Sequence, residues 1–429
     1  MLTSIIMLAV FFFIFLIAKL TFVNKHDYKF IILLMVLFIF TFNPSLGYET
    51  MTGYELNPIR INTITLAIFI CLIFLNSHQS IKLGKEFLFF GPLCLLIIFD
   101  FFFRTSDLYK FFSITFIYIS IIMLYFIVNK INILPINKIF RGVSYLAIIN
   151  SILSILQYST GARFLIGSFN ETILYTEGAE VVKRAVGLAG TNNSAGNFSA
   201  VIFAVVLYNF YKKKSFYNII VLILALVATI LTFTRIAYVA IILQMAIFYV
   251  FYKVKSKKVL RNRIILTSIS FPILLFIVYI SADEIIQKLF TERGNTESAR
   301  FTQFSIAYEN IVSTHLWFGV GTGQYRSYLF NHFGIIDIDL HSQYLNVLAE
   351  NGIFIFLLFA WFNFWLLFKA FKNNNQFEIR LLTLAIFLGN FICSNFNPNA
   401  HYYLVNILYY LLMFILARGL ANENIKEHA

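Results

Sequence analysis

Long apolar runs follow one another along almost the whole chain, separated mostly by short polar segments. Runs of roughly 18 residues or more are the pattern of membrane-spanning helices. Thirteen runs can be drawn; they cover residues 2–23, 29–43, 59–76, 87–103, 108–128, 138–157, 195–211, 216–233, 235–252, 264–281, 351–371, 380–395 and 400–418. The pattern predicts an all-α polytopic membrane protein, a single integral membrane domain over residues 1–429 with about 12–14 transmembrane helices.

Two polar segments are much longer than the rest, residues 158–194 and residues 282–350. The second gathers ionisable side chains in an otherwise apolar chain; they are Arg293, Arg300, Arg326, His315, His332, His341, Asp337, Asp339 and Glu350. Ionisable groups kept between membrane spans commonly serve ligand binding or catalysis. We therefore expect the loop of residues 282–350 to carry the chemistry.

The same loop contains the pattern of an amphipathic helix. N-cap chemistry is available from Thr296 to Ser298, and an apolar stripe follows before Gly319. The stripe consists of Phe301, Phe304, Ile306, Tyr308 and Ile311. We expect this helix to lie along the outer surface of the membrane or over the helical bundle.

Composition and charge set the orientation. Only 12% of the residues are charged and 60% are hydrophobic, whereas a soluble domain is about half apolar and about a quarter charged. The densest Lys and Arg clusters, at residues 212–214 and 253–263, are predicted to face the cytoplasm, so both long polar segments face outward. The formal net charge of +13 then reflects topology and predicts no nucleic-acid binding.

The three cysteines, Cys71, Cys94 and Cys393, lie in apolar runs and predict neither a disulfide nor a metal site.

One arginine stands between two apolar runs. Arg235 lies at the predicted outer end of the ninth run, where an arginine ordinarily extends its charge to the membrane surface. Arg300 and His341 lie on the same predicted side. Two guanidiniums bind phosphate groups bidentately, and a histidine moves a proton near neutral pH. These three residues are the candidate catalytic set.

The first long loop supplies a second candidate region. Arg184 precedes the sequence GLAGTNN, which leads into the seventh apolar run. Backbone N–H groups at the start of a helix bind anionic groups, so Arg184 and Asn192 are candidate substrate contacts. The alternative is a capped helix start within a polar loop.

The stretch HSQYLNVLAENGIF begins at His341 and leads into the eleventh run. It predicts a short helix whose apolar side is formed by Tyr344, Leu345, Leu348 and Ala349. Taken alone, a histidine at such a place is more often structural than catalytic.

In this order, the residues resemble the O-antigen ligase and O-antigen polymerase superfamily of bacterial membrane glycosyltransferases. The family pattern has an Arg in an SRG-like context, a loop Arg ahead of GxG, and HNxxLxxxxExG. This chain has Arg235 in a TxxR context, Arg300 ahead of GVGTGQY, and His341 at the start of HSQYLNVLAENG. The resemblance spans roughly residues 190–352, and Ser342 stands where the family usually has Asn.

The resemblance implies a GT-C-like helical bundle that transfers a glycan from undecaprenyl pyrophosphate at the outer face of the bacterial cytoplasmic membrane, without a cofactor. It implies that Arg235 and Arg300 hold the pyrophosphate and that His341 serves catalysis. Cations suit a leaving pyrophosphate, and a base activates the acceptor hydroxyl, so we expect inverting displacement at the anomeric carbon. Either Glu350 or Asp339 orients His341 or replaces it as the base.

The full set of expected pyrophosphate or glycan contacts is Arg235, Arg300, Arg184, Asn192, Tyr344 and Glu350. The expected partners are the lipid-linked glycan donor and acceptor, membrane lipids and a chain-length regulator. A polymerase joins lipid-linked repeat units of an O-antigen or capsular polysaccharide, whereas a ligase moves the finished glycan to lipid A core or to protein. We expect the polymerase, because the Phe, Ile, Tyr and Asn content resembles that of such polymerases.

Two further alternatives concern charged residues. Asp100 and Arg104, four residues apart at the end of the fourth run, suit the substrate path of a lipid-linked oligosaccharide flippase, or an ion pair that caps the span. The sequence from Asp337 to Asp339 resembles a DxD metal motif, with a solvated acidic turn as the preferred reading. We expect no metal.

Overall fold

The computed structural model describes residues 49–52, 55–58, 84–130, 136–165, 171–177, 180–254, 256–280 and 296–419. The first three predicted apolar runs, residues 2–23, 29–43 and 59–76, lie outside the described residues, as does Arg293. The described part of the chain is mostly helical, which confirms the predicted helical class. The total of thirteen spans stays a prediction.

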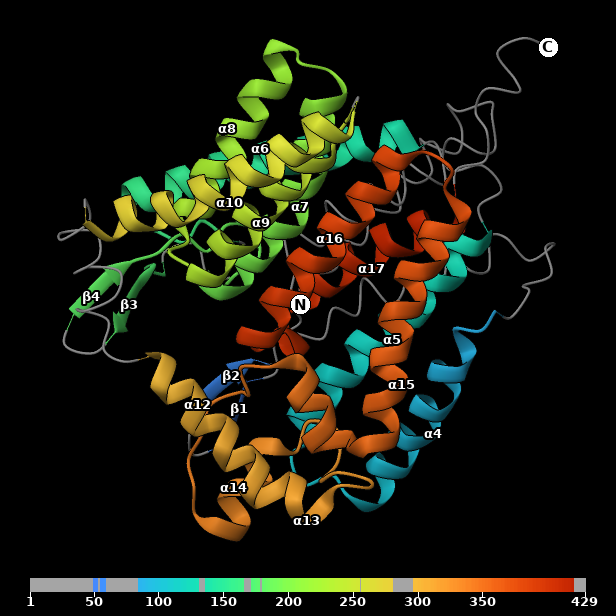
Figure 1. Ribbon diagram of the computed structural model, residues 1–429. Coiled ribbons are helices and arrows are strands. Elements are labelled where there is room, and N and C mark those ends of the chain that lie inside the picture. Colours follow the sequence, from blue (N-terminus) through green and yellow to red (C-terminus); the bar gives the residue numbers. More distant parts are fainter. Residues whose placement is uncertain are drawn as a thin grey trace, which may run out of the picture.

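Ten apolar helices coincide with the ten predicted runs from residue 87 onward (Figure 1). They are α4 (Phe87–Phe103), α5 (Leu108–Lys130), α6 (Ile136–Thr160), α7 (Asn192–Lys212), α8 (Phe216–Leu231), α9 (Arg235–Phe251), α10 (Lys257–Ile280), α15 (Gln343–Asn373), α16 (Phe377–Phe396) and α17 (Tyr403–Arg418). Within the described residues, α5, α6, α7, α15 and α16 are long and apolar enough to cross a membrane, and α4, α8, α9 and α17 are shorter apolar helices. The protein is an integral membrane protein.

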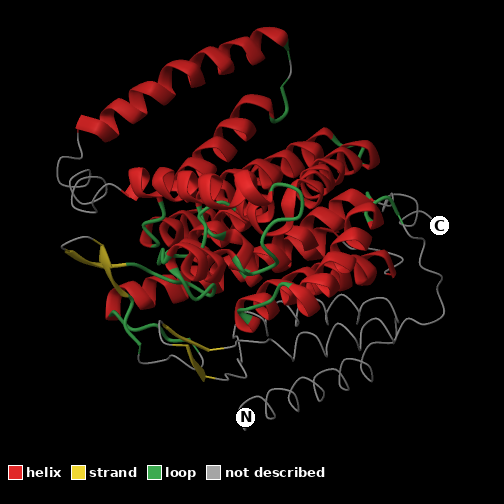
Figure 2. Cartoon of the chain, turned by 90° about the horizontal axis from the view of Figure 1, so that it is seen from below, coloured by secondary structure: helices red, strands yellow, loops and turns green. Residues whose placement is uncertain are grey.

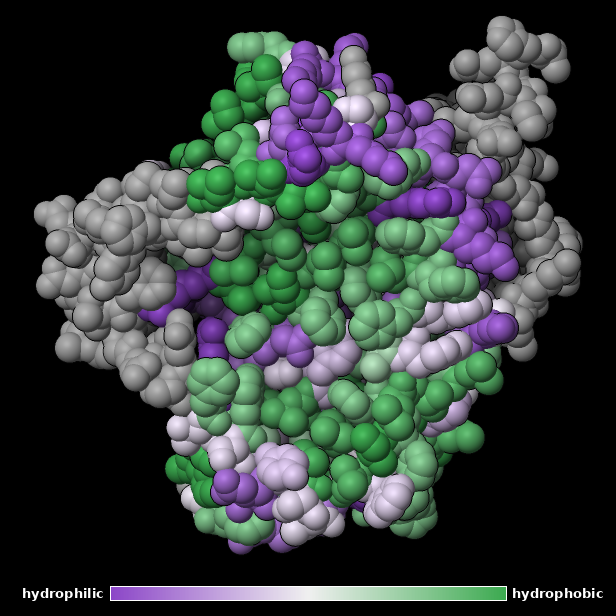
Figure 3. Space-filling model, in the orientation of Figure 1, coloured by the Kyte–Doolittle hydropathy of each residue, from purple (hydrophilic) through white to green (hydrophobic). Residues whose placement is uncertain are grey.

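The core of the bundle lies around α7 and α17. Residues 404–417 of α17 are all buried, and so are residues 194–208 of α7. Helices that are apolar on all sides belong in the interior. On the outer helices the apolar side chains point away from the bundle, with Phe103 74% and Phe216 79% exposed. Apolar residues accordingly cover much of the described surface (Figure 3), as expected of a surface that faces lipid.

Short helices form a separate layer at one end of the bundle (Figure 1). They are α12 (Thr296–Ala307), the π-helical turn η2 (Tyr308–Val312), α13 (Ser313–His315) and α14 (Tyr325–Phe333). We call residues 296–342 the cap. The predicted amphipathic helix is confirmed as α12, whereas α14 was not predicted. The cap has its own small core, in which Ile311, Leu329 and Leu340 are buried against Ala349 of α15.

Two short antiparallel hairpins lie at the edge of the bundle (Figure 2). One pairs β1 (Glu49–Thr52) with β2 (Glu55–Pro58), and the other pairs β3 (Leu174–Glu177) with β4 (Glu180–Lys183). The second hairpin lies in the first long polar segment, where no strand was predicted. A short 3₁₀ turn, η3 (Asn399–His401), joins α16 to α17.

A kink divides α15 into a short helix and a long span. Gly352 has φ 77° and ψ 177°, a conformation that favours glycine. A Cβ atom at this position would lie 2.2 Å from the backbone oxygen of Trp317, so the backbone of the cap approaches too closely for any side chain. The short helix begins at the N-cap Ser342, whose hydroxyl accepts from the Leu345 N–H at 3.2 Å. The predicted short helix ahead of the eleventh run is thus confirmed.

Candidate functional site

The glycine-rich loop GVGTGQY lies along the kink of α15. The Val320 N–H donates to the Ala349 carbonyl at 3.0 Å, and the Gly321 N–H donates to the Glu350 carbonyl at 2.8 Å. A Cβ atom on Gly319 would lie 2.3 Å from the Glu350 backbone. The loop therefore needs a glycine at position 319 for close backbone approach, which supports a structural role.

The Glu350 carboxylate is buried beneath this loop. One oxygen accepts from the Gly323 N–H at 2.9 Å and from the Asn346 side chain at 3.0 Å, and the other accepts from the Tyr325 N–H at 3.2 Å. N–H groups at the start of a helix need such acceptors. Glu350 therefore holds the start of α14. These contacts favour an architectural role over its predicted contact with substrate, which stays a prediction.

The turn between α4 and α5 anchors the same loop from the other side. Asp100 and Arg104 form the predicted ion pair. The second Asp100 oxygen accepts from the Thr322 N–H at 2.8 Å and from its hydroxyl at 2.7 Å. Arg104 donates to the carbonyl of Phe318 at 2.8 Å. The pair therefore fastens the cap to the bundle.

His341 is held by a glutamine of α12. The Gln303 side-chain oxygen accepts from the His341 backbone N–H at 3.0 Å and lies 3.1 Å from the ring atom Nδ1. The Gln303 side-chain nitrogen donates to both carboxylate oxygens of Asp337, at 3.1 and 3.2 Å. The Tyr325 hydroxyl donates to the same carboxylate at 2.6 Å. Gln303 thus links the candidate histidine to a carboxylate of the DID sequence.

Arg300 and His341 interact electrostatically. Burial and the Arg300 guanidinium lower the pKa of His341, Asp339 and Asp337 oppose the change, and the net pKa is about 4. The imidazole is therefore neutral at pH 7 and able to accept a proton. The structure thus brings together two of the three predicted catalytic residues.

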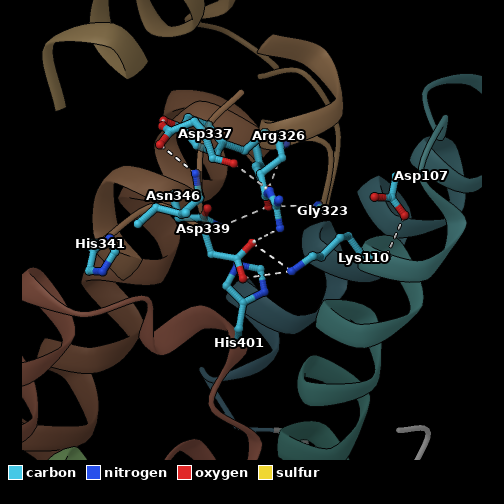
Figure 4. A network of polar contacts seen from close by, with 12 residues as sticks. Asp107, Lys110, Gly323, Arg326, Asp337, Asp339, His341, Asn346 and His401 are labelled. Atoms are coloured by element: carbon cyan, nitrogen blue, oxygen red, sulfur yellow. Dashed lines mark hydrogen bonds and ion pairs between the residues drawn. The ribbon is translucent and has the colours of Figure 1, made fainter. Parts of the chain in front are cut away.

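A cationic cluster surrounds Asp339 (Figure 4). Lys110 Nζ lies 2.8 Å from both carboxylate oxygens, while Arg326 Nη1 lies 3.9 Å and His401 Nε2 3.8 Å from one of them. These residues come from the start of α5, from α14 and from η3. Burial raises the pKa of Asp339, but its basic neighbours outweigh this effect, so the net pKa lies well below its ordinary value. Burial lowers the pKa of His401 to about 4, so this histidine is neutral at pH 7.

Arg235 is the first residue of α9. Its neighbour Ile236 packs against a small buried cluster formed by Ala200, Ala240 and Cys393, the last of which belongs to α16. Two residues further along α16, the Asn395 side chain accepts from Ser342 at 3.5 Å, and Ser342 directly follows the candidate histidine. The start of α9 and the segment that carries His341 thus both pack near the same end of α16.

Arg184 is buried against the turn between α8 and α9. Its guanidinium donates to the carbonyls of Thr232 at 2.9 Å and Phe233 at 3.0 Å, and to the side chains of Thr234 and Asn193, each at 3.3 Å. Carbonyl groups at the end of a helix need donors. Arg184 therefore supports the turn on which α9 begins, and its predicted contact with pyrophosphate stays a prediction.

The start of α7 has the capped geometry that was one of the two alternatives. The Thr191 hydroxyl accepts from the Ser194 N–H at 3.4 Å. Asn192 is buried, and its carbonyl accepts from Thr234 at 3.0 Å. Tyr344, another predicted substrate contact, packs between the rings of Phe359 and Phe391, at centroid distances of 5.2 and 5.3 Å.

Buried amides join four helices just beneath the cap, and we call them the amide junction. Asn397 donates to Asn197 at 2.6 Å, and Asn197 donates to Asn399 at 3.2 Å. Asn399 donates to Gln343 at 2.9 Å, and Gln343 donates to Asn406 at 3.3 Å. All five are buried. The junction fixes η3, which carries His401, against α7 and α15.

A comparison with protein families matches the part of the chain that carries the predicted catalytic residues. Residues 220–360 match the family model described as O-antigen ligase. This match confirms the resemblance to the O-antigen polymerase and ligase superfamily. The matched segment is about a third of the chain and includes Arg235, Arg300, His341 and Glu350. Curated proteins give no match.

Members of the O-antigen ligase family are glycosyltransferase-like enzymes, so the match indicates polymerase or ligase activity in general.

Within the described residues, no group of three or more His, Cys, Asp or Glu side chains is arranged to hold a metal ion. In the DID sequence, the oxygens of Asp337 face Gln303 and Tyr325, and those of Asp339 face Lys110.

The predicted site did not include Lys110, Gln303 or His401. In the sequence, Lys110 is only a cation at the start of an apolar run, which is a weak indication of a site residue. His401 follows the polar sequence NPNA between the last two runs, which is a weak indication as well. Gln303 is one polar residue in an amphipathic helix and carries no sequence signal of its own. Only the fold, which packs the cap against the start of α5 and against η3, brings them to the candidate site.

Proposed function

We propose that the protein polymerises undecaprenyl-pyrophosphate-linked oligosaccharide repeat units at the outer face of the bacterial cytoplasmic membrane. The observation that carries this proposal is His341, held by Gln303 and within electrostatic reach of Arg300, inside the segment that matches the O-antigen ligase family model. Lys212, Lys213 and Lys214 are exposed at the opposite end of the bundle, where the positive-inside rule puts the cytoplasm. The site then faces the side to which lipid-linked repeat units are delivered.

In the proposed reaction, the acceptor sugar hydroxyl attacks the anomeric carbon of the donor. His341 takes the hydroxyl proton, the new C–O bond forms, and the bond to the pyrophosphate oxygen breaks with inversion. Arg235 and Arg300 stabilise the negative charge that develops on the departing undecaprenyl pyrophosphate. No cofactor is needed, because the pyrophosphate is itself a good leaving group.

The second candidate is a ligase or oligosaccharyltransferase that moves the finished glycan to lipid A core or to protein. The description of the matched family model, O-antigen ligase, favours this candidate. Both candidates use the same donor chemistry and differ in the acceptor. The amino-acid composition of the chain supports the polymerase, whose acceptor is another lipid-linked repeat unit or a growing chain, with a chain-length regulator as a proposed partner.

The test is the length distribution of the glycan in cells that lack their own copy of the gene and are complemented with variants. Arg235→Ala, Arg300→Ala and His341→Ala should reduce the ladder to single repeats while membrane levels remain normal. His332→Ala, which changes an exposed histidine of α14, is the matched control and should leave the ladder intact. Accumulation of lipid-linked polymer without surface glycan would instead identify the ligase. Normal ladders in all three variants would exclude the proposed site.

A further inference from the structure

Gln303 makes a set of contacts that fixes the direction of its own amide group. The Asp337 carboxylate accepts hydrogen bonds and donates none, so the Gln303 nitrogen must face it, at 3.1 and 3.2 Å. The backbone N–H of His341 donates and accepts none, so the Gln303 oxygen must face it, at 3.0 Å. Both constraints select the same orientation of the amide. The Tyr325 hydroxyl, 2.6 Å from Asp337, holds the carboxylate in place.

The amide orientation in turn determines the state of the His341 ring. The Gln303 oxygen lies 3.1 Å from Nδ1 and can only accept a hydrogen bond. Nδ1 must therefore carry a proton. In a neutral imidazole with a proton on Nδ1, the other ring nitrogen, Nε2, is unprotonated and is the atom that accepts.

We propose that Gln303 is a positioning residue that keeps the proton of His341 on Nδ1, so that Nε2 is the nitrogen that receives a proton, and that Asp337 keeps Gln303 in this orientation. The tautomer follows from the contact between Nδ1 and Gln303; the backbone carbonyl of Asp339 also accepts a hydrogen bond from the ring, as a protonated ring nitrogen requires. The use of this tautomer in catalysis rests on the proposed function, in which Nε2 takes the proton of the acceptor hydroxyl.

The charged groups around His341 are compatible with this arrangement. Arg300 faces it from α12, and Asp337 and Asp339 face it from the segment that precedes α15. Gln303 itself is 5% exposed and neutral, so it orients the ring without adding a charge that would protonate it. A glutamate in its place would accept the same two hydrogen bonds, but would favour the cationic imidazole.

The first experiment reads the tautomer directly. The purified full-length protein, labelled with ¹⁵N at its 7 histidines, is studied by NMR in lipid nanodiscs, and His341 is assigned by the signals lost in His341→Asn. The wild type should show Nδ1 protonated and Nε2 unprotonated at pH 7. Gln303→Leu should move the ring toward the Nε2-protonated form that an unconstrained histidine prefers. Gln376→Leu, at an exposed glutamine before α16, is the matched control and should change nothing.

A second variant keeps the test decisive if Gln303→Leu does not fold. In the double variant Gln303→Glu with Asp337→Asn, which avoids placing two carboxylates against each other, the added carboxylate should raise the pH at which His341 becomes protonated by about 1–3 pH units. An Nε2-protonated wild type would overturn the proposal. So would an unchanged His341 titration in the double variant, or a tautomer that Gln303→Leu leaves unchanged.

Glycan synthesis separates this proposal from the proposed function. We expect Gln303→Leu to lower the polymerisation rate by roughly 10²-fold, because the nitrogen facing the acceptor would then carry a proton. A changed tautomer with normal synthesis would support the positioning of His341 and exclude this histidine as the base. An unchanged tautomer, together with synthesis that depends on His341, would support the proposed function and overturn the role of Gln303.

Discussion

His341 and Glu350 lie at the two ends of one short helix and belong to the same sequence motif, yet the structure treats them differently. The Glu350 carboxylate accepts three hydrogen bonds from the loop and from its own helix. The His341 ring has one nitrogen fixed by Gln303, and the inferred tautomer gives the other nitrogen a lone pair. One motif residue thus supports the cap, and the other is prepared for chemistry. A sequence motif shows which residues belong together, but it does not show which of them support the fold and which take part in the reaction.

The largest expected effect tests the architecture that the two residues share. Gly352→Ala should cost more than about 3 kcal/mol and detach the cap, because its Cβ would meet the Trp317 backbone at 2.2 Å and φ is 77°. Thermal unfolding in detergent and protease cleavage of the cap measure the effect. Gly334→Ala is the control: Gly334 also has a positive φ, 65°, but its Cβ would meet no atom within 4 Å. Equal effects of the two changes would contradict the steric explanation.

The next prediction addresses the chemical end of the helix. His341→Asn should lower polymerisation by roughly 10²- to 10⁴-fold, since it removes the proposed base. The unfolding temperature should change little by comparison. Rates measured with purified protein and lipid-linked repeat units, alongside the melting curve, separate the two quantities. A variant that loses stability and activity together would place His341 with Glu350 among the supporting residues.

Glu350→Ala should show the opposite pattern. It leaves buried donors of Gly323, Tyr325 and Asn346 without their acceptor, and each such loss costs about 1–3 kcal/mol. We expect the melting temperature to fall strongly, with activity lost in proportion to the folded protein. Glu309→Ala, which changes an exposed glutamate of the same cap, is the control. A stable, folded and inactive Glu350→Ala variant would instead assign Glu350 to the reaction.

The pH dependence of stability sharpens the comparison further. Burial lowers the pKa of His341 and of His401 to about 4 in the folded protein, against about 6.5 in an unfolded chain. Between these values the unfolded state binds more protons, so stability should fall as pH drops from 6.5 to 4. The Asp339 pKa is lowered below its ordinary 3.8, so its contribution is lost only at still lower pH. Melting temperatures measured across this range test the sign, and His401→Asn should flatten the curve.

The smallest effect concerns the cationic cluster. Lys110→Met removes the 2.8 Å contacts with Asp339 and should destabilise the docked cap by about 1–2 kcal/mol. Lys110 also lowers the pKa of His401, so that pKa should rise in the variant. Lys212→Met, at an exposed lysine of the opposite end, serves as the control in the same melting and titration experiments. No change in either quantity would show that Arg326 alone holds Asp339.

Sequence reasoning located the helices well because each depends on local apolar content. The run predicted at residues 87–103 is α4, and the helix predicted to begin near Thr296 is α12. The partners of polar residues were much harder to predict. Lys110 and Asp339 are 229 positions apart, and Arg184 donates to the backbone carbonyls of Thr232 and Phe233, which no side-chain pattern reveals. Arg300 and His341 were predicted to meet, and they interact electrostatically. Gln303, which links His341 to Asp337, had no feature in the sequence that would have indicated this role.

The amide junction has a consequence for how the protein comes apart. Amide side chains do not change charge at ordinary pH, so the bonds among Asn197, Asn397 and Asn399 persist at acidities that protonate His341 and His401. Acid should therefore weaken the cap while leaving the helices beneath it joined. We expect hydrogen exchange at low pH to reveal two cooperative units, a cap that opens first and a bundle that opens later, with the boundary at η3.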